Sequence, residues 1–116
     1  MKYFLIFFIF FGATNGLDAA DDKSKEIEMP EIFISGNAAK GSQLVESCAA
    51  CHGADGNSIS TDWPKLNGQN QRYLYEQLKY FRDGERMNVL MMSVTPYLQT
   101  LSDEDLLDIA AFYAQY

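Results

Sequence analysis

Apolar residues recur at the three-to-four-residue spacing of amphipathic helices in three stretches of this chain. The spacing predicts helices over about residues 37–50, 71–82 and 103–115. Their apolar positions are Ala38, Gly41, Leu44, Val45 and Cys48 in the first, Leu74, Leu78 and Phe81 in the second, and Leu106, Ile109, Ala110 and Tyr113 in the third. No stretch alternates apolar and polar residues as a half-buried strand does, so the pattern indicates an all-α fold.

Residues that suit helix ends flank these three stretches. Gly53 and Gly56 follow the first stretch, and Gly84 follows the second. Ser102 precedes the third as an N-cap, and residues 103–105 place three carboxylates in its first turn, where they favour the positive end of the helix dipole.

The N-terminal pattern is that of an exported protein. Lys2 precedes a short apolar run, and small residues follow up to Gly16. The run is well short of the roughly 20 apolar residues that span a bilayer and fits the core of a secretory signal peptide. We expect residues 1–16 to be a signal peptide, with a retained N-terminal anchor as the alternative. Residues 17–34 read as an acidic flexible linker, which leaves residues 35–116 as the folded domain.

The charge of the chain limits its partners. The formal net charge is −7, and loss of residues 1–16 removes Lys2 and makes it −8. No basic patch is available to neutralise phosphates, so we expect no nucleic-acid partner. An acidic surface favours proteins that carry a basic docking face, and we expect no stable membrane insertion once the signal peptide is removed.

The chemistry of the chain is concentrated in Cys48-Ala49-Ala50-Cys51-His52, which contains its only cysteines and its only histidine. This spacing is the attachment sequence of covalent c-type haem. Each thiol forms one thioether with a haem vinyl group, and His52 can ligate the iron. A Cys48–Cys51 disulfide would close a very small loop, a thioredoxin-like pair needs a βαβ unit that is not visible, and zinc usually takes a fourth ligand.

A second axial ligand must come from a residue other than histidine, and methionine is the usual choice. Met87, Met91 and Met92 all lie between the second and third predicted helices. A single methionine most often fills a core, but three in a loop with Asn88, Ser93 and Pro96 suggest a ligand loop. We favour Met92, then Met91, then Met87.

The ordered set of motifs over about residues 36–116 resembles a class I cytochrome c of the short bacterial kind, and one half of its tandem two-haem members. The matching segments are 48–57, Trp63-Pro64-Lys65-Leu66-Asn67-Gly68-Gln69, Phe81-Arg82-Asp83-Gly84-Glu85-Arg86, Met91-Met92, 101–106 and 110–114. The resemblance implies three to four helices around one haem c, with His52 and Met92 as the iron ligands. It also implies that the Pro64 carbonyl accepts from the ring of His52 and that the first and last helices cross, bringing Gly41 near Phe112 and Tyr113.

These features together predict a periplasmic one-electron carrier with redox proteins as donor and acceptor, and not an enzyme. A cytochrome subunit of a larger oxidoreductase and a haem-based ligand sensor are the alternatives. Arg72, Arg82 and Arg86 are candidates to reach the haem propionates, although each also fits a solvated surface position.

Overall fold

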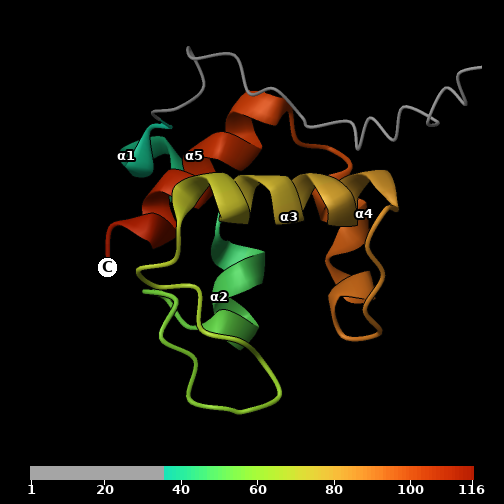
Figure 1. Ribbon diagram of the computed structural model, residues 1–116, viewed down its shortest axis with the longest axis horizontal. Helices are drawn as coiled ribbons and strands as arrows, with labels where there is room; N and C mark the ends of the chain where they lie inside the picture. The colour runs from blue at the N-terminus through green and yellow to red at the C-terminus, as the bar shows by residue number, and fades with distance from the viewer. Residues whose placement is uncertain (1–35) are drawn as a thin grey trace, which may run out of the picture.

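The computed structural model describes residues 36–116 of the chain. This part is all-helical and contains no strand, which confirms the predicted fold class (Figure 1). The elements are α1 (Ala38–Gly41), α2 (Glu46–His52), α3 (Gln71–Asp83), the 3₁₀ helix η2 (Met91–Ser93), α4 (Thr95–Leu98) and α5 (Asp103–Ala114). The predicted signal peptide at 1–16 and the acidic linker at 17–34 lie outside the described residues.

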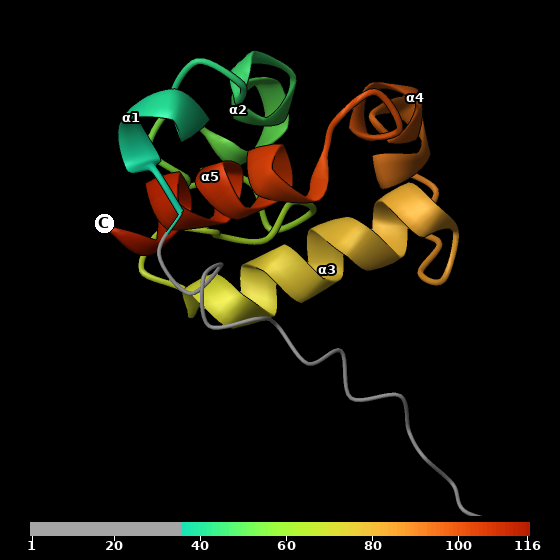
Figure 2. The same cartoon turned by 90° about the horizontal axis from the view of Figure 1, so that it is seen from above.

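Helix α5 forms the centre of the fold. Every residue from 106 to 113 is buried, and α1 and α3 both pack against it, so that α5 lies between them in Figure 2. The helix begins as predicted, because the Ser102 side chain accepts from the Asp105 backbone N–H at 3.1 Å and the Asp105 carboxylate accepts from the Ser102 N–H at 2.9 Å. This reciprocal pair satisfies two amides that the first turn leaves without helical partners.

The predicted helix over 37–50 is wrong as a single element, since the chain forms α1 and α2 with a turn between them. Gly41 explains the break: a Cβ there would collide with the carbonyl oxygen of Asp108 and lie 3.0 Å from the Cβ of Phe112. The chain therefore passes α5 in close contact at Gly41 and then turns, so that α2 runs in a different direction from α1 (Figure 1). The predicted approach of Gly41 to Phe112 is confirmed, whereas Tyr113 instead lies against Gly56.

Helix α3 matches its prediction within a residue. The Asn70 side chain accepts from the Tyr73 N–H at 3.0 Å, and Gly84 ends the helix in the left-handed conformation with φ of 77°. Asp103, at the start of α5, accepts from Lys79 at 3.1 Å and pairs with Arg82 at 2.6 Å, which ties α3 to α5.

Two connecting segments complete the fold. Residues 53–70 form a long loop that is fixed to α5, since the Gly68 N–H donates to the Tyr113 carbonyl at 2.9 Å. The segment after α3 contains η2 and α4, and the Tyr97 hydroxyl donates to the Leu44 carbonyl at 2.9 Å. None of the helices within residues 36–116 has the length and apolar character needed to cross a bilayer.

Candidate functional site

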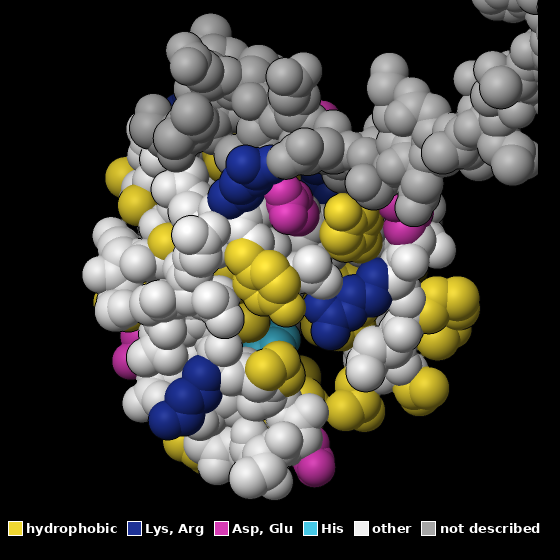
Figure 3. All heavy atoms as spheres, viewed as in Figure 1, with side chains coloured by type: hydrophobic (Ala, Val, Ile, Leu, Met, Phe, Trp, Pro, Cys, Tyr) yellow, Lys and Arg dark blue, Asp and Glu magenta, His cyan; other side chains and the backbone are white. Residues whose placement is uncertain are grey.

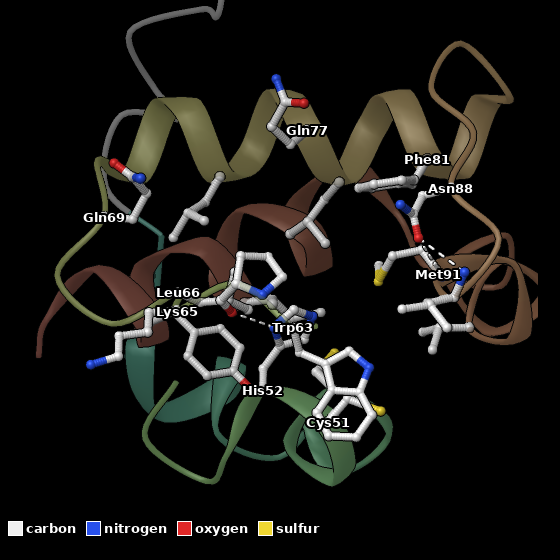
Figure 4. A pocket seen from close by; sticks show the side chains of 18 of the residues that line it. Cys51, His52, Trp63, Lys65, Leu66, Gln69, Gln77, Phe81, Asn88 and Met91 are labelled. Carbon is white, nitrogen blue, oxygen red and sulfur yellow. Dashed lines mark hydrogen bonds between the residues drawn. The ribbon is translucent and has the colours of Figure 1, made fainter. Parts of the chain in front are cut away.

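A cavity of about 240 Å³ opens between α2, α3, α5, the 53–70 loop and the segment that follows α3 (Figure 4). Much of its wall is apolar, with contributions from Leu66, Leu74, Leu78, Phe81, Val94 and Ile109. Cys48, Cys51 and His52 line it on one side. The fold therefore brings the attachment sequence to the edge of an apolar cavity.

His52 is held in a fixed orientation at the end of α2. Its side chain is buried, and its Nδ1 lies 2.7 Å from the carbonyl oxygen of Pro64. A carbonyl can only accept, so Nδ1 carries the proton and donates, which leaves the Nε2 lone pair available to a metal. The contact expected between Pro64 and His52 is present, and it is the kind of outer hydrogen bond that orients a ligating imidazole.

Both cysteines are free thiols, one α-helical turn apart on α2. Cys48 is 8% exposed, and burial raises its pKa to about 11. Cys51 is partly exposed on the same cavity wall. The absence of a disulfide between them leaves both sulfur atoms available for thioether bonds.

The three candidate methionines occupy different environments. Met91 lines the cavity opposite His52, and its sulfur points inward in Figure 4. Met92 is 52% exposed and Met87 is 76% exposed, and neither belongs to the cavity wall. Successive residues of a 3₁₀ helix point about 120° apart, so η2 cannot direct Met91 and Met92 to the same place. This placement does not support the sequence-based preference for Met92 and favours Met91.

Among the candidate arginines, only Arg86 reaches the cavity. Its Nη1 donates to the Gln77 side chain at 2.6 Å, and its guanidinium lies 4.7 Å from the centre of the Phe81 ring. Arg82 instead pairs with Asp83 and Asp103, and Arg72 pairs with Glu76. Sequence reasoning did not assign a role at the site to several other polar residues of the wall, among them Asp62, Lys65, Gln69 and Asn88.

The chemistry of the wall fits a haem group. An imidazole nitrogen and a thioether sulfur face the cavity from two sides, and two thiols stand beside the imidazole. The hydroxyl of Tyr113 is buried in the same wall and has no hydrogen-bond partner within residues 36–116. Buried hydroxyls normally have a partner, and a polar group on a cavity occupant would provide one.

Comparison with known proteins agrees with this reading of the site. The cytochrome c family profile matches residues 38–115. The chain belongs to the cytochrome c family. As a member of that family, this cytochrome binds haem c covalently, and Cys48 and Cys51 stand in the attachment motif.

Two relatives and one solved structure show which part of the family this cytochrome resembles. It is 44% identical over 80 residues to cytochrome c-554(548) of Halomonas halodenitrificans, covering 69% of this chain and 96% of that protein. It is 48% identical over 80 residues to cytochrome c4 of Pseudomonas aeruginosa, covering 69% of this chain but 38% of that protein. The crystal structure of reduced recombinant cytochrome c4 from Pseudomonas stutzeri superposes with a TM-score of 0.63 at 42% identity, over 69% of this chain and 45% of that chain.

The fraction of each relative that the alignment covers shows which part of it this cytochrome matches. The cytochrome spans nearly all of the first relative and less than half of either cytochrome c4. It is a class I c-type cytochrome that resembles one half of cytochrome c4, as the sequence motifs predicted.

Proposed function

We propose that this chain is a one-electron carrier that holds a single haem c through thioether bonds from Cys48 and Cys51, with His52 and Met91 as the axial ligands. The observation that carries the proposal is the shared cavity: the imidazole of His52 and the side chain of Met91 line the same apolar space as both cysteines.

Each of these residues has a defined task in the proposal. The hydrogen bond from His52 Nδ1 to Pro64 fixes the tautomer and raises the basicity of the nitrogen that binds iron. Met91 provides a thioether, which raises the reduction potential of a His-ligated haem. Haem c, when bound, supplies an iron that gains and loses one electron.

The surrounding residues adjust the electrostatics of the site. The apolar wall excludes water and strengthens interactions between charges inside the cavity. Arg86 has no carboxylate partner within residues 36–116 and is held at the wall by the neutral side chains of Gln77 and Phe81. Its guanidinium is therefore available to a carboxylate of the bound haem, for which it offers a forked pair of donors.

An optical and mass analysis of the purified holoprotein tests the proposal. We expect low-spin spectra in both oxidation states, reversible one-electron reduction, and an intact mass that exceeds the processed polypeptide by one haem. Haem that separates from the chain on acid–acetone extraction would contradict covalent attachment. Rapid binding of carbon monoxide by the reduced protein would instead favour the ligand sensor, because a carrier with Met91 bound has no open coordination position.

We also propose that the protein is exported to the periplasm with residues 1–16 as its signal peptide and residues 17–34 as a linker. The support is the apolar run after Lys2 and the acidic composition of the linker. N-terminal sequencing of holoprotein recovered from a periplasmic fraction tests both parts. A mature chain that begins near residue 17 is expected, and an intact Met1 in a membrane fraction would favour a retained anchor.

A further inference from the structure

The segment that passes over the cavity carries no charge. Residues 87–101 contain no Asp, Glu, Lys, Arg or His over fifteen consecutive positions, in a chain that is 22% charged. The segment includes η2 and α4 and provides Met91 and Val94 to the cavity wall. This segment therefore adds no charge to the edge of the site that it forms.

Four side chains at the start of this segment are apolar and face solvent. They form what we call the 87–92 patch, and their exposed fractions are 76% for Met87, 84% for Val89, 53% for Leu90 and 52% for Met92. The same segment contributes Leu98 to the core, where it is fully buried. The four patch side chains are therefore additional to the apolar group that anchors the segment. Contiguous exposed apolar side chains of this kind mark interaction sites on soluble proteins.

The patch borders the opening of the cavity. Leu90 belongs both to the patch and to the cavity wall, and Asn88 and Met91, which alternate with patch residues, line the cavity. Figure 3 shows hydrophobic side chains gathered on this side of the opening through which the histidine is visible. A protein seated on the patch would therefore lie close to the contents of the cavity.

Most acidic groups near this face are paired with arginines, and Glu85, which is exposed just before the patch, is followed directly by Arg86. Asp83 and Asp103 pair with Arg82, and Glu76 pairs with Arg72. Within the cavity wall Asp62 is accompanied by Lys65 and Arg86. The net charge of −7 thus describes the whole chain and not this face.

We propose that the 87–92 patch is the docking site for a redox partner protein whose matching face is apolar and uncharged. The proposal rests on the electron-carrier function and replaces the basic docking face that the net charge of the chain predicted. Contact through such a face depends on apolar burial, so its strength responds little to ionic strength.

Two other occupants fit the observations less well. A second copy of the chain would bring together two molecules of net charge −7, which repel at low ionic strength. An anionic membrane surface attracts basic segments, and the patch contains no basic residue.

Direct voltammetry of the holoprotein on alkanethiol monolayers on gold tests the chemistry of the docking face. We expect the electron-transfer rate to be higher on methyl-terminated than on amine-terminated monolayers, and to change by less than about twofold between ionic strengths of about 0.01 M and 0.15 M. Val89→Asp places a charge in the contact and should lower the rate on the methyl surface by about tenfold, because burying an unpaired charge costs more than 1.4 kcal/mol. Val89 does not line the cavity, so the optical spectrum should not change, and the rates of the variants are compared at the measured potential of each.

Gln43→Asp is the matched control, because it introduces the same charge at an exposed residue between α1 and α2, outside the cavity wall. It should leave the rate on the methyl surface unchanged. The proposal is overturned if the amine surface gives the higher rate and that rate falls with salt, or if Val89→Asp and Gln43→Asp behave alike. It is also overturned if Val89→Asp abolishes a dimer detected by sedimentation, or abolishes flotation with phosphatidylcholine vesicles.

Failure of the docking proposal differs from failure of the proposed function. A holoprotein that shows a reversible wave on the amine surface but not on the methyl surface remains an electron carrier with a different docking face. A holoprotein that shows no reversible reduction even with soluble mediators is not a carrier.

Discussion

Asn88 determines which methionine faces the cavity. Its side-chain oxygen accepts from the backbone N–H groups of Leu90 at 2.9 Å and Met91 at 3.3 Å, and its carbonyl accepts from the Met92 N–H at 3.0 Å. These bonds fix the turn that leads into η2 and direct Met91 inward (Figure 4). An Asn side chain that bonds to the backbone two residues ahead is a common device for starting a turn.

Met91→Ala should remove the distal ligand, while Met92→Ala should leave it in place. Loss of the thioether is expected to abolish the weak long-wavelength band of the oxidised protein, lower the reduction potential and open the iron to carbon monoxide. Spectra and potentiometric titration of the two variants make the comparison. Loss of the band in Met92→Ala and its retention in Met91→Ala would restore the choice made from the sequence.

Arg86→Gln should lower the reduction potential by roughly tens of millivolts, because a cation beside the cavity disfavours the more positive oxidised iron. Arg72→Gln removes the same charge at a residue that pairs with Glu76 outside the cavity wall, and should have a smaller effect. Potentials measured over a range of pH also report whether a propionate has lost its counter-ion, since its pKa would then rise into the measured range. Equal shifts in the two variants would contradict a local role for Arg86.

Single residues were predictable where the chemistry depends on adjacent positions. The motif placed Cys48, Cys51 and His52 on one wall, and the family resemblance anticipated the contact with Pro64. Whether Met91 or Met92 points into the cavity depends on how the three-residue helix η2 is rotated about its axis. The spacing of apolar residues along the sequence does not predict that rotation. Arg86 could be separated from Arg72 and Arg82 only after the partners of all three were known.

Among the elements, the longest helices were the ones that the sequence predicted well. Helices α3 and α5 each have three turns and clear end signals, so their apolar spacing and caps agree. Helices α1, η2 and α4 have three or four residues each, too few for a period to show. The break between α1 and α2 arises from the close approach of Gly41 to α5, which is a tertiary contact that local propensity does not encode.

Gly41→Ala should destabilise the holoprotein although alanine is the better helix former. Helix propensity alone would stabilise the variant by roughly 0.5–1 kcal/mol. A Cβ at this position collides with the backbone of Asp108, and overpacking of this kind costs about 1–3 kcal/mol. Urea denaturation gives the sign, and Ala39→Gly at an exposed position of α1 measures the propensity effect separately. A stabilised Gly41→Ala variant would show that α1 moves away from α5 freely.

The link between α3 and α5 should depend on pH. Burial raises the pKa of Asp103, but the hydrogen bonds from Arg82 and Lys79 outweigh this and hold it below its ordinary value. A carboxyl with a lowered pKa in the folded state stabilises the protein above its unfolded pKa of about 3.9, and the contribution is lost as the pH falls through the folded value. Asp103→Asn should therefore reduce stability by up to about 1 kcal/mol near pH 7, since the group is half exposed.

The difference between Asp103→Asn and the unmodified protein should shrink below about pH 4, where the carboxyl begins to protonate. Glu104→Gln is the control, because Glu104 shares the first turn of α5 and lies 3.9 Å from Lys40 with both side chains exposed. Thermal unfolding of the three proteins across this pH range is the measurement. A gap that persists unchanged at low pH would assign the effect of Asp103 to something other than its charge.

At the scale of the whole molecule, α2 is the element that depends most on the cavity. Helices α1 and α3 pack extensively on α5, whereas α2 has little direct packing against the other helices. Instead, Ser47, Cys48, Cys51 and His52 of α2 line the cavity. A domain of this size also buries too little surface to be very stable by itself. The contents of the cavity should therefore supply much of the apolar contact that holds α2 in place.

Replacing both Cys48 and Cys51 with Ala should give a haem-free chain with much less helix than the holoprotein. Circular dichroism measures the loss, and amide hydrogen exchange should show it first in α2 and the 53–70 loop, with α5 retaining the most protection. Helicity equal to that of the holoprotein would mean that the polypeptide core is sufficient without the cofactor.

The burial of Cys48 imposes an order in time on the making of this protein. In the folded chain Cys48 is only 8% exposed and burial raises its pKa to about 11, so at neutral pH it is a protonated thiol with little surface accessible to an attachment enzyme. Bond formation at Cys48 must therefore precede the closing of α2 against the rest of the domain. Thioether formation at Cys48 therefore competes with the packing of α2 in the haem-free chain. Any change that favours this packing before haem is attached should lower the yield of finished protein.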